Sequence, residues 1–391
     1  MGVAVQIVGW VVALAWVVRV VEAHRGLPGV PDLLRAEYDL EPVGMPGVTV
    51  IVPARNEAKD IGECLESLLR QDYGGVRVLA VDDRSTDGTG AVMDELAGKW
   101  PERLRVLHVA ELPAGWLGKT HAMAKAAEVA ETEFLLFTDG DILFRQDAVR
   151  RAVANAVATG ADHLVLVPTT IIHRWDEAAL LSFFQIFGLW AARPWKVADP
   201  KAQDAIGIGA FNLIRAAAYR KIGGFESFPM EIVEDLGLAR RVKWAGLKQR
   251  VAVGRGMVRV HWAAGARGLI RVMTKNVFSA FNFHVSLLLV GCLWLTVFCV
   301  LPFFALLVPG LRVQACVSVA AMAYAYVLMS RPSGLSAWNV LLAPFAALMF
   351  VYTLLRSMVA TLARGGVVWR DTFYSLKELR SHTVPLVRRR R

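Results

Sequence analysis

The sequence has few cysteines, and their spacing excludes a cysteine metal site. The four are Cys64, Cys292, Cys299 and Cys316, and none of them forms the closely spaced pairs that hold zinc. Three of the four fall in long apolar stretches. They are therefore predicted to be unpaired packing residues of a protein in a reducing compartment. Internal repeats and low-complexity segments are also lacking, and 391 residues suffice for one large domain or two ordinary ones.

Charge is scarce near the N-terminus. Residues 3–22, VAVQIVGWVVALAWVVRVVE, are mostly apolar and long enough for one membrane helix. Arg19 lies close enough to the end of this run to reach the membrane surface. A cleaved signal peptide is the alternative, but no Lys or Arg precedes the apolar run. We therefore predict a transmembrane helix over residues 1–23.

Three further stretches of low charge follow residue 283, at about 284–309, 311–330 and 338–361. Buried helices of a soluble core would not normally be so long and so poor in charge. Hydrophobic residues make up 55% of the chain, a high share for a soluble protein. The sequence thus predicts an integral membrane protein whose residues 284–363 form a transmembrane region of about three helices.

Residues 45–260 differ from both ends because their charge density is ordinary. Strand patterns at 48–57, 76–83, 104–109 and 133–138 alternate with helical patterns. This order, with continuous apolar strands, predicts an α/β domain whose mostly parallel sheet is covered by helices on both faces. The carboxyl ends of such strands form the edge at which ligands bind.

Basic residues cluster beside the apolar ends. The net charge is +10, and the clusters are HRG, ARGLIRVMTK and the C-terminal RRRR. Nucleic acid is one partner of a basic protein, but this placement fits anionic lipid head groups and the positive-inside rule better. We expect no nucleic acid, an amphipathic interfacial segment at 261–283, and a basic tail at 364–391.

The same charges predict a multi-pass protein of the cell (inner) membrane with the soluble domain and the tail in the cytoplasm. Three spans after a cytoplasmic domain would, however, leave the tail outside. One apolar segment must then be re-entrant, interfacial or doubled. A further apolar and aromatic stretch at 180–195 could be core, an interfacial helix or the wall of a lipid-acceptor site.

Three acidic pairs are expected near the ligand-binding edge of the sheet: Asp82-Asp83, Asp139-x-Asp141 and Glu234-Asp235. An acidic residue after the second strand commonly binds a ribose or base. Two carboxylates flanking a glycine can hold a hard divalent cation and its phosphate ligands. The alternatives are an ordinary Asp-Gly turn for residues 139–141 and a helix-start charge for Glu234-Asp235.

Six motifs, in order between residues 50 and 246, resemble those of the family 2 glycosyltransferases. They are VIVPARNE, VDDRSTDGTG, GKTHAMAKA, LLFTDGD, GAFNLIRAAAYRKIGGF and EDLGLARRVKWAG. The resemblance implies the GT-A fold and inverting transfer from a nucleotide-sugar donor, expected to be a UDP-sugar. The membrane-flanked layout, with LPAGWLGKTHAM and GGVVWRDTFYSL, looks most like the bacterial hopanoid-associated, carotenoid and ceramide-type lipid glycosyltransferases.

Matched position by position, the resemblance implies three groups of site residues. The donor pocket would contain Pro53, Ala54, Arg55, Glu57, Asp82, Asp83 and Lys119, with Gly209 and Ala210 near the donor sugar or the acceptor. Asp139 and Asp141 would bind Mg²⁺ or Mn²⁺, with Asp141 touching the metal. Asp235, beside Glu234, would be the catalytic base.

One departure from the family pattern concerns polymer synthesis. Processive members carry a QxxRW motif after the ED pair, and this sequence has none there, since Arg174-Trp175 lies upstream. The absence counts against a polysaccharide synthase and leaves the diphosphate without its usual extra cationic partner. Arg267, Arg271 and Lys275 could replace it, or they could form a basic amphipathic face on the membrane surface.

The sequence therefore predicts a membrane-bound, metal-dependent enzyme that moves a single sugar from a nucleotide sugar to the hydroxyl of a lipid acceptor. A polyprenyl-phosphate sugar transferase would use the same donor site with a phosphate acceptor. A catalytically silent membrane scaffold with the same fold is the alternative from a different class, and the intact DGD and ED pairs argue against it.

Overall fold

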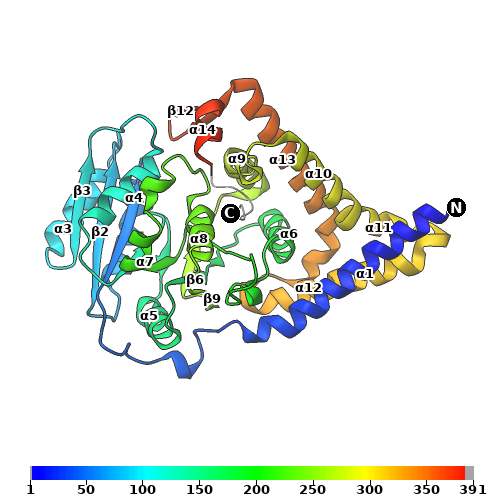
Figure 1. Cartoon of the computed structure of the whole chain (residues 1–391), viewed down its shortest axis with the longest axis horizontal. Coiled ribbons are helices and arrows are strands. Elements are labelled where there is room, and N and C mark those ends of the chain that lie inside the picture. Colours follow the sequence, from blue (N-terminus) through cyan, green and yellow to red (C-terminus); the bar gives the residue numbers. More distant parts are fainter. Residues whose placement is uncertain (1, 384–391) are drawn as a thin grey trace. The chain divides into compact units, whose positions relative to one another are not determined.

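The computed structural model describes residues 2–383, which form two compact units (Figure 1). The sheet unit contains residues 30–171 and 196–261, with the segment that starts at residue 377. The helical unit contains the described residues up to Gly29, together with residues 172–195 and 262–376. Residues 172–195, which lie inside the range 45–260 expected for the soluble domain, thus belong to the helical unit.

The sheet unit is built on seven strands in the order β3-β2-β1-β4-β8-β6-β9. They are β1 (Val48–Ala54), β2 (Val76–Asp83), β3 (Leu104–Val109), β4 (Phe134–Phe137), β6 (His163–Val167), β8 (Asn212–Arg215) and β9 (Gln249–Val253). Only β8 runs antiparallel to its neighbours in this sheet. The predicted mostly parallel α/β sheet is confirmed.

Helices cover both faces of this sheet because its strands are apolar on both sides. Along β1, Val50 and Val52 pack on one face, whereas Ile51 packs on the other. The first face is covered by α2 (Ile61–Leu69), α3 (Thr89–Lys99) and α5 (Ala148–Thr159). The second is covered by α4 (Gly118–Glu128), α7 (Ala216–Lys221) and α8 (Glu234–Trp244). A smaller sheet contains β5 (Leu143–Phe144), β10 (Val258–Val260) and β7 (Thr169–Thr170).

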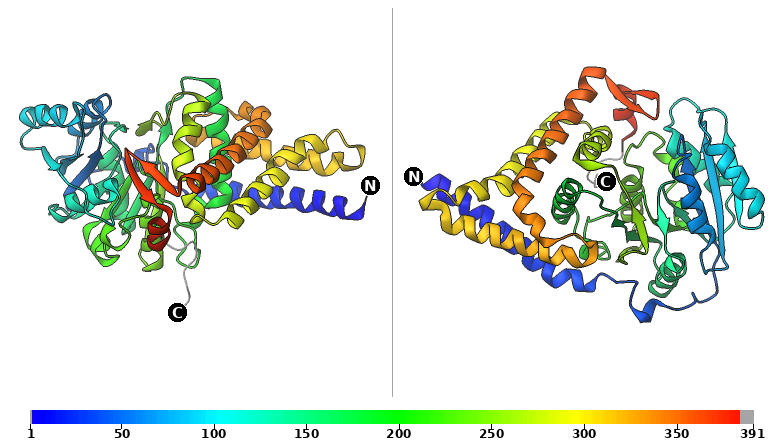
Figure 2. Two further views of the ribbon diagram at one scale, coloured as in Figure 1. Left: turned by 90° about the horizontal axis from the view of Figure 1, so that it is seen from above. Right: turned by 180° about the vertical axis from the view of Figure 1, so that it is seen from behind.

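Within the described residues, four helical stretches are long and apolar enough to cross a membrane. They are Val3–Gly29, Val285–Ala305, Pro309–Ser333 and Ala337–Arg364. These stretches contain α1 (Val3–Gly26), α10 (Val285–Leu295), a π-helical turn (Thr296–Val300), α11 (Leu301–Ala305), α12 (Arg312–Ser333) and α13 (Ala343–Arg364). Figures 1 and 2 show α1 alongside α12. Membrane-type helices are thus present at both predicted ends, and their topology remains a prediction.

The helical unit also contains two helices from outside these stretches. The first is α6 (Trp175–Ala191), whose Phe183 is buried and whose Phe187 ring lies 5.2 Å from that of Phe350 in α13. The apolar stretch at 180–195 therefore contributes to the core of this unit. The second is α9 (Gly265–Asn276), which buries Leu269 and Met273.

The basic face of α9 is exposed, since Arg267, Arg271 and Lys275 recur every fourth residue on its solvent side. The predicted amphipathic character is present, and its location at a membrane surface remains a prediction. After α13 come the hairpin of β11 (Gly366–Trp369) and β12 (Thr372–Ser375) and the short α14 (Leu376–His382). The RRRR end of the predicted basic tail lies outside the described residues.

Candidate active site

The predicted acidic motifs lie at the carboxyl edge of the main sheet. In the parallel register, Ala54 at the end of β1 is opposite Asp82 near the end of β2. The strand β4, on the other side of β1, ends at Phe137, just before the DGD motif. Because parallel neighbouring strands end at the same edge, the loops that carry Arg55, Asp83 and Asp139 lie together.

Two of these loops are joined by hydrogen bonds. The main-chain N–H of Asn56 donates to Ser85 Oγ (3.0 Å), and Asn56 Oδ1 accepts from the N–H of Thr86 (2.8 Å). The N–H of Glu57 donates to Thr89 Oγ1 (2.8 Å). Asn56 has a positive φ of 55°, a conformation that Asn tolerates better than most residues. Asn56 was not among the predicted site residues, although it lies in the PARNE turn between two residues that were, Arg55 and Glu57.

Asp82 and Asp83 both have protein partners. The Asp83 carboxylate is 3% exposed and accepts hydrogen bonds from Arg84 Nε (2.8 Å) and Nη2 (3.0 Å). Asp82 accepts from the N–H of Ser85 and lies 3.2 Å from His108 Nδ1. Hydrogen bonds to Asp94 and Asp82 raise the pKa of His108. The predicted contact of Asp82 and Asp83 with a nucleotide remains a prediction.

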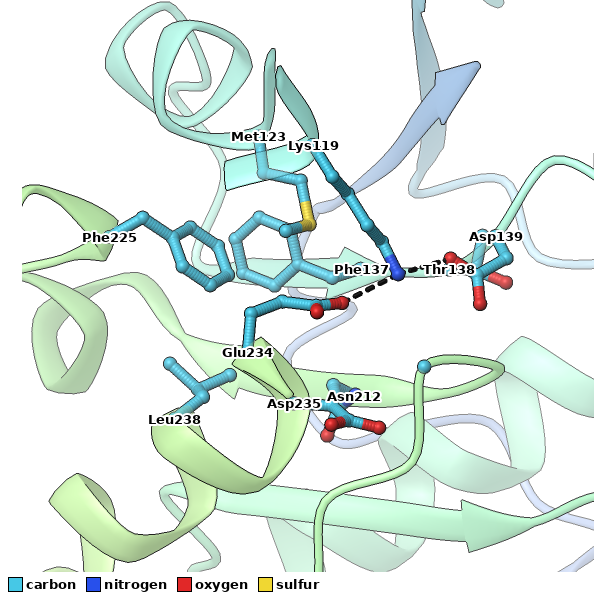
Figure 3. A pocket seen from close by; sticks show the side chains of 11 residues that line it. Lys119, Met123, Phe137, Thr138, Asp139, Asn212, Phe225, Glu234, Asp235 and Leu238 are labelled. Carbon is cyan, nitrogen blue, oxygen red and sulfur yellow. Dashed lines mark ion pairs between the residues drawn. The ribbon is translucent and has the colours of Figure 1, made fainter. Parts of the chain in front are cut away.

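Lys119, the second residue of α4, joins two of the predicted motifs. Its Nζ lies 2.5 Å from Asp139 Oδ1 and 2.5 Å from Glu234 Oε1 (Figure 3). Burial by itself would lower the pKa of Lys119, but the charges of Asp139 and Glu234 outweigh it and raise the pKa. Lys119 was predicted to reach the nucleotide or its phosphates, but these ion pairs were not predicted, because they join three segments far apart in the chain.

Glu234 and Asp235 begin α8, and burial raises the pKa of both. For Glu234 the pKa is raised to about 7, although the Lys119 charge opposes the rise. For Asp235 the rise in pKa is opposed by the charge of Lys119 and by hydrogen bonds from the main-chain N–H groups of Leu236 (2.7 Å) and Gly209. A carboxylate with a raised pKa is a stronger base at neutral pH.

Gly209 and Gly207 pass close to the acidic residues. A Cβ added at Gly209 would lie 2.6 Å from Asp139 Oδ2, and one at Gly207 would overlap the main-chain carbonyl of Asp235. Gly207 therefore leaves no room for a side chain, whereas a side chain at Gly209 would push the Asp139 carboxylate aside. Gly209 was predicted to lie near the donor sugar or the acceptor, whereas Gly207 was not among the predicted site residues.

The lining of one pocket brings together five of the predicted site residues: Lys119, Asp139, Gly209, Glu234 and Asp235 (Figure 3). Six other residues complete this lining: Met123, Phe137, Thr138, Asn212, Phe225 and Leu238. Outside this lining, three predicted residues without a polar side chain are buried, namely Pro53, Ala54 and Ala210. Any contact that they make with a ligand must use the main chain. Asn212 was missed although it lies in the GAFNLIR motif.

Comparison with known proteins covers seven of the eleven residues that line this pocket, and Phe225, Glu234, Asp235 and Leu238 lie beyond the matched range. Residues 49–223 match the sequence model described as glycosyl transferase family 2. This domain belongs to glycosyltransferase family 2. The predicted family is confirmed.

The glycosyltransferase domain has curated relatives and solved structural neighbours. The 4,4'-diaponeurosporenoate glycosyltransferases of Staphylococcus aureus strains MRSA252 and USA300 are each 30% identical over 196 residues, or 49% of this chain and 50% of theirs. The chain thus spans about half the length of the curated relatives it matches. The mannosyltransferase PcManGT from Pyrobaculum calidifontis, solved with GDP-Man and Mn²⁺, has a TM-score of 0.54 and 19% identity, over 91% of this chain and 97% of that one. This likeness supports the predicted GT-A fold.

The glycosyltransferase domain has two carboxylates suited to a divalent cation. Burial, with the charges of Asp139 and Glu57, raises the pKa of Asp141 to about 7. A cation beside Asp141 would offset this repulsion. Among the described residues no group of three or more His, Cys, Asp or Glu side chains could hold a metal ion. Mg²⁺, however, is commonly held by one or two carboxylates with substrate phosphates and water. Asp139 and Asp141 fit that donor set.

Proposed function

We propose that this protein is a membrane-bound inverting glycosyltransferase that moves one sugar from a nucleotide sugar to a hydroxyl group of a lipid acceptor. The observation that carries the proposal is the cluster of Lys119, Asp139, Glu234 and Asp235 in one pocket of a family 2 domain. The pocket combines a cation, a candidate metal ligand and two carboxylates with raised pKa values.

Asp235 acts as the general base in this proposal. It takes the proton of the acceptor hydroxyl as the acceptor oxygen bonds to the anomeric carbon, while the bond from that carbon to the diphosphate breaks. A single displacement of this kind inverts the anomeric configuration and needs no covalent enzyme intermediate. Glu234 is engaged by Lys119, which favours Asp235 for this role.

Asp139 and Asp141 would hold Mg²⁺ or Mn²⁺. When bound, the ion neutralises negative charge on the departing nucleoside diphosphate. Lys119 adds a positive charge on the Asp139 side of the pocket. Arg55 and Glu57 follow β1, and Asp82 and Asp83 end β2 at the same edge. All four are proposed to line the nucleotide site. A UDP-sugar is the proposed donor, and the solved neighbour PcManGT carries GDP-Man with Mn²⁺.

A hydrophobic acceptor is supported by two observations. Four helical stretches of the described chain can span a membrane, and the curated relatives are named for transfer to 4,4'-diaponeurosporenoate. We propose a multi-pass protein of the inner membrane with its catalytic domain in the cytoplasm. A polyprenyl-phosphate acceptor would require extra cationic groups at the acceptor side of the pocket.

The test uses the purified full chain in lipid nanodiscs with a membrane lipid extract and a panel of labelled nucleotide sugars. We expect label in the lipid fraction with one donor, in Mg²⁺ or Mn²⁺ and not in EDTA. The matched control is the same assay with Asp235→Asn. The absence of lipid-linked label with every donor and metal would contradict the proposal. Label on a lipid phosphate instead of a hydroxyl would favour the polyprenyl-phosphate alternative.

Metal dependence can be tested without turnover. We expect a nucleoside diphosphate to bind at least about tenfold more weakly in EDTA than in Mn²⁺, because two carboxylates alone repel a diphosphate. Calorimetric titration of the full chain under both conditions measures this difference. Equal affinity in both would remove the proposed metal role from Asp139 and Asp141.

A further inference from the structure

Three buried polar side chains form a chain across neighbouring strands of the main sheet. His163 in β6, Asn212 in β8 and Gln249 in β9 are 0%, 2% and 1% exposed. His163 pairs with Gln249 in the parallel register and with Ile214 on the antiparallel side, two residues from Asn212. Side chains directly opposite or diagonal across neighbouring strands share a face and can touch. The three therefore form one connected group.

The hydrogen bonds among the three side chains run from Gln249 through His163 to Asn212. Gln249 Nε2 lies 2.8 Å from His163 Nδ1 and donates to the carbonyl oxygen of Ile206 (2.9 Å). With Nδ1 as the acceptor, the other ring nitrogen of His163 carries the hydrogen and donates to Asn212 Oδ1 (3.2 Å). Asn212 Nδ2 then donates to the carbonyl oxygen of Ile208 (2.6 Å).

The histidine in this chain is neutral at physiological pH, since burial lowers the pKa of His163 to about 4. A neutral imidazole has one donor and one acceptor nitrogen, which are the two roles that the chain requires. Protonation of His163 at Nδ1 would place a second N–H opposite the amide N–H of Gln249. The hydrogen bond between these two side chains would then be lost.

A fourth buried side chain holds the next part of the same loop. Thr138 Oγ1 donates to the carbonyl oxygen of Ala210 (2.8 Å). Thus the carbonyl groups of Ile206, Ile208 and Ala210 each accept a hydrogen bond from one buried side chain. Residues 206–210, here called the glycine loop, lie outside helices and strands. Side chains here supply hydrogen-bond partners to main-chain carbonyl groups that no helix or strand pairs.

The glycine residues between these carbonyl groups face the acids of the active site. A Cβ on Gly207 would overlap the main chain of Asp235, and one on Gly209 would crowd Asp139. The glycine loop is therefore enclosed between the buried chain on one side and Asp139 and Asp235 on the other. A shift of the loop would move both contacts at once.

We propose that His163, Asn212 and Gln249 are positioning residues, which clamp the glycine loop and so fix the placement of Asp139 relative to Asp235. The proposal rests on the proposed function, in which Asp139 helps to hold the donor and Asp235 takes the proton of the acceptor hydroxyl. Misplacement of reacting groups by about 1 Å can cost about 100-fold in rate, so a rigid loop at this position matters for turnover more than for donor binding.

The clamp itself is tested by hydrogen–deuterium exchange on the full chain in nanodiscs. We expect His163→Leu to speed exchange of a peptide covering residues 206–212 at least about tenfold, because an apolar side chain cannot relay the hydrogen bonds. His163→Gln should stay within about threefold of the wild type, because its amide offers one donor and one acceptor. Asn212→Ala is a second disrupting variant if His163→Leu does not fold.

Val78→Ala provides the matched control. Val78 is buried in β2, which β1 and β4 separate from β8 in the sheet. This variant should lower thermal stability while leaving exchange of the glycine loop, relative to other sheet-unit peptides, as in the wild type. If the disrupting variants leave loop exchange unchanged, or if Val78→Ala changes it equally, the clamp is disproved.

Kinetics then test what the clamp does. In the disrupting variants we expect kcat to fall about tenfold or more, nucleoside diphosphate affinity to change less than threefold, and His163→Gln to restore most of kcat. Faster loop exchange with unchanged kcat would overturn the positioning role. If the wild type itself transfers no sugar, the proposed function fails, whereas the exchange experiment still decides whether the clamp exists.

Discussion

At the scale of single residues, Lys119 explains how the pocket tolerates several carboxylates in little space. An uncompensated buried carboxylate is costly, and Glu234 is 7% exposed. The ammonium group of Lys119 lies between Glu234 and Asp139 and offsets part of that cost. Asp235 has no ion pair as close among the described contacts and relies on two main-chain N–H groups. These contacts support the proposed role of Asp235 as the general base.

Asp235→Asn separates catalysis from helix capping. Asn cannot accept a proton near neutral pH, so transfer should fall by about 100-fold or more, with donor affinity nearly unchanged. Asp141→Asn should weaken binding of metal and donor together with turnover, since Asp141 is the proposed metal contact. Turnover, donor affinity and apparent Tm measured for both variants test these expectations.

A charge that only stabilises the start of α8 would behave differently. Asn also suits helix starts, so the stability loss would be at most about 1 kcal/mol and activity would remain. Near-wild-type transfer by Asp235→Asn would remove Asp235 from the proposed mechanism.

His163 should make the sheet unit sensitive to acid. Burial lowers its folded-state pKa to about 4, below the value of about 6.5 for an unfolded chain. The unfolded state therefore binds the proton first, and stability present above pH 6.5 is lost as the pH falls toward 4. Proton linkage therefore lowers the free energy of unfolding by about 2 kcal/mol between pH 7 and pH 5.

The measurement is the apparent Tm of the wild type and of His163→Gln at pH 7 and pH 5. The carboxylates that titrate in this range are common to both proteins, so their contribution cancels in the comparison. We expect the apparent Tm of the wild type to fall further between pH 7 and pH 5 than that of His163→Gln. An equal loss in both would show that His163 takes no part in the acid response.

At the scale of elements, local patterns predicted the first half of the sheet unit. The strand at 48–54 and the helix at 61–69 follow from apolar runs and from the helical spacing of Ile61, Leu65 and Leu68. The position of β8, antiparallel between β4 and β6, depends on pairing between residues far apart in the chain. The assignment of α6 to the helical unit likewise depends on distant contacts such as that of Phe187 with Phe350.

The candidate site likewise combines residues that local motifs predicted with contacts that depend on distant parts of the chain. Motif order located Asp139, Glu234 and Asp235 because each follows a recognisable strand end or starts a helix. The ion pairs of Lys119 and the hydrogen bonds of Asn212 could not be predicted, because they join distant segments and leave no periodic pattern in the sequence.

The glycine loop yields a prediction at this scale. Gly207→Ala places a methyl group against the main chain of Asp235, which cannot move cheaply, so both transfer and apparent Tm should fall. Gly209→Ala meets only the end of the Asp139 side chain, which can rotate. We expect it to keep the Tm within about 3 °C, equivalent to less than about 1 kcal/mol, and to weaken donor binding.

Gly98→Ala is the control for these variants. Gly98 is an exposed residue of α3 with open space around its Cβ position, and Ala there should stabilise the helix by up to about 1 kcal/mol. Donor titration and thermal unfolding of all three variants provide the comparison. A Gly207→Ala protein with normal Tm and normal transfer would contradict the proposed close fit at Asp235.

At the scale of the whole molecule, the chain combines a donor-binding domain with helices of membrane length. The net charge of +10 and the exposed basic face of α9 favour an anionic lipid surface. The four candidate spans leave the predicted conflict in place, since the three that follow the catalytic domain would put the C-terminal tail on the other side of the membrane from that domain. The long α12 contains Pro332 and α11 contains Pro302, and either could belong to a segment that does not cross fully.

The proposed combination of a lipid acceptor with this active site predicts that transfer stops after one sugar. An acceptor whose hydrophobic tail stays in the bilayer can present its own hydroxyl to Asp235, but an added sugar moves the next hydroxyl away from the base. The missing QxxRW motif points in the same direction. Mass spectrometry of the lipid fraction should show a single added sugar unit, even with excess donor and long incubation, and no product with Asp235→Asn. A ladder of regularly spaced masses would show that the acceptor can move through the site after each step, and the protein would then be a polymerase despite lacking that motif.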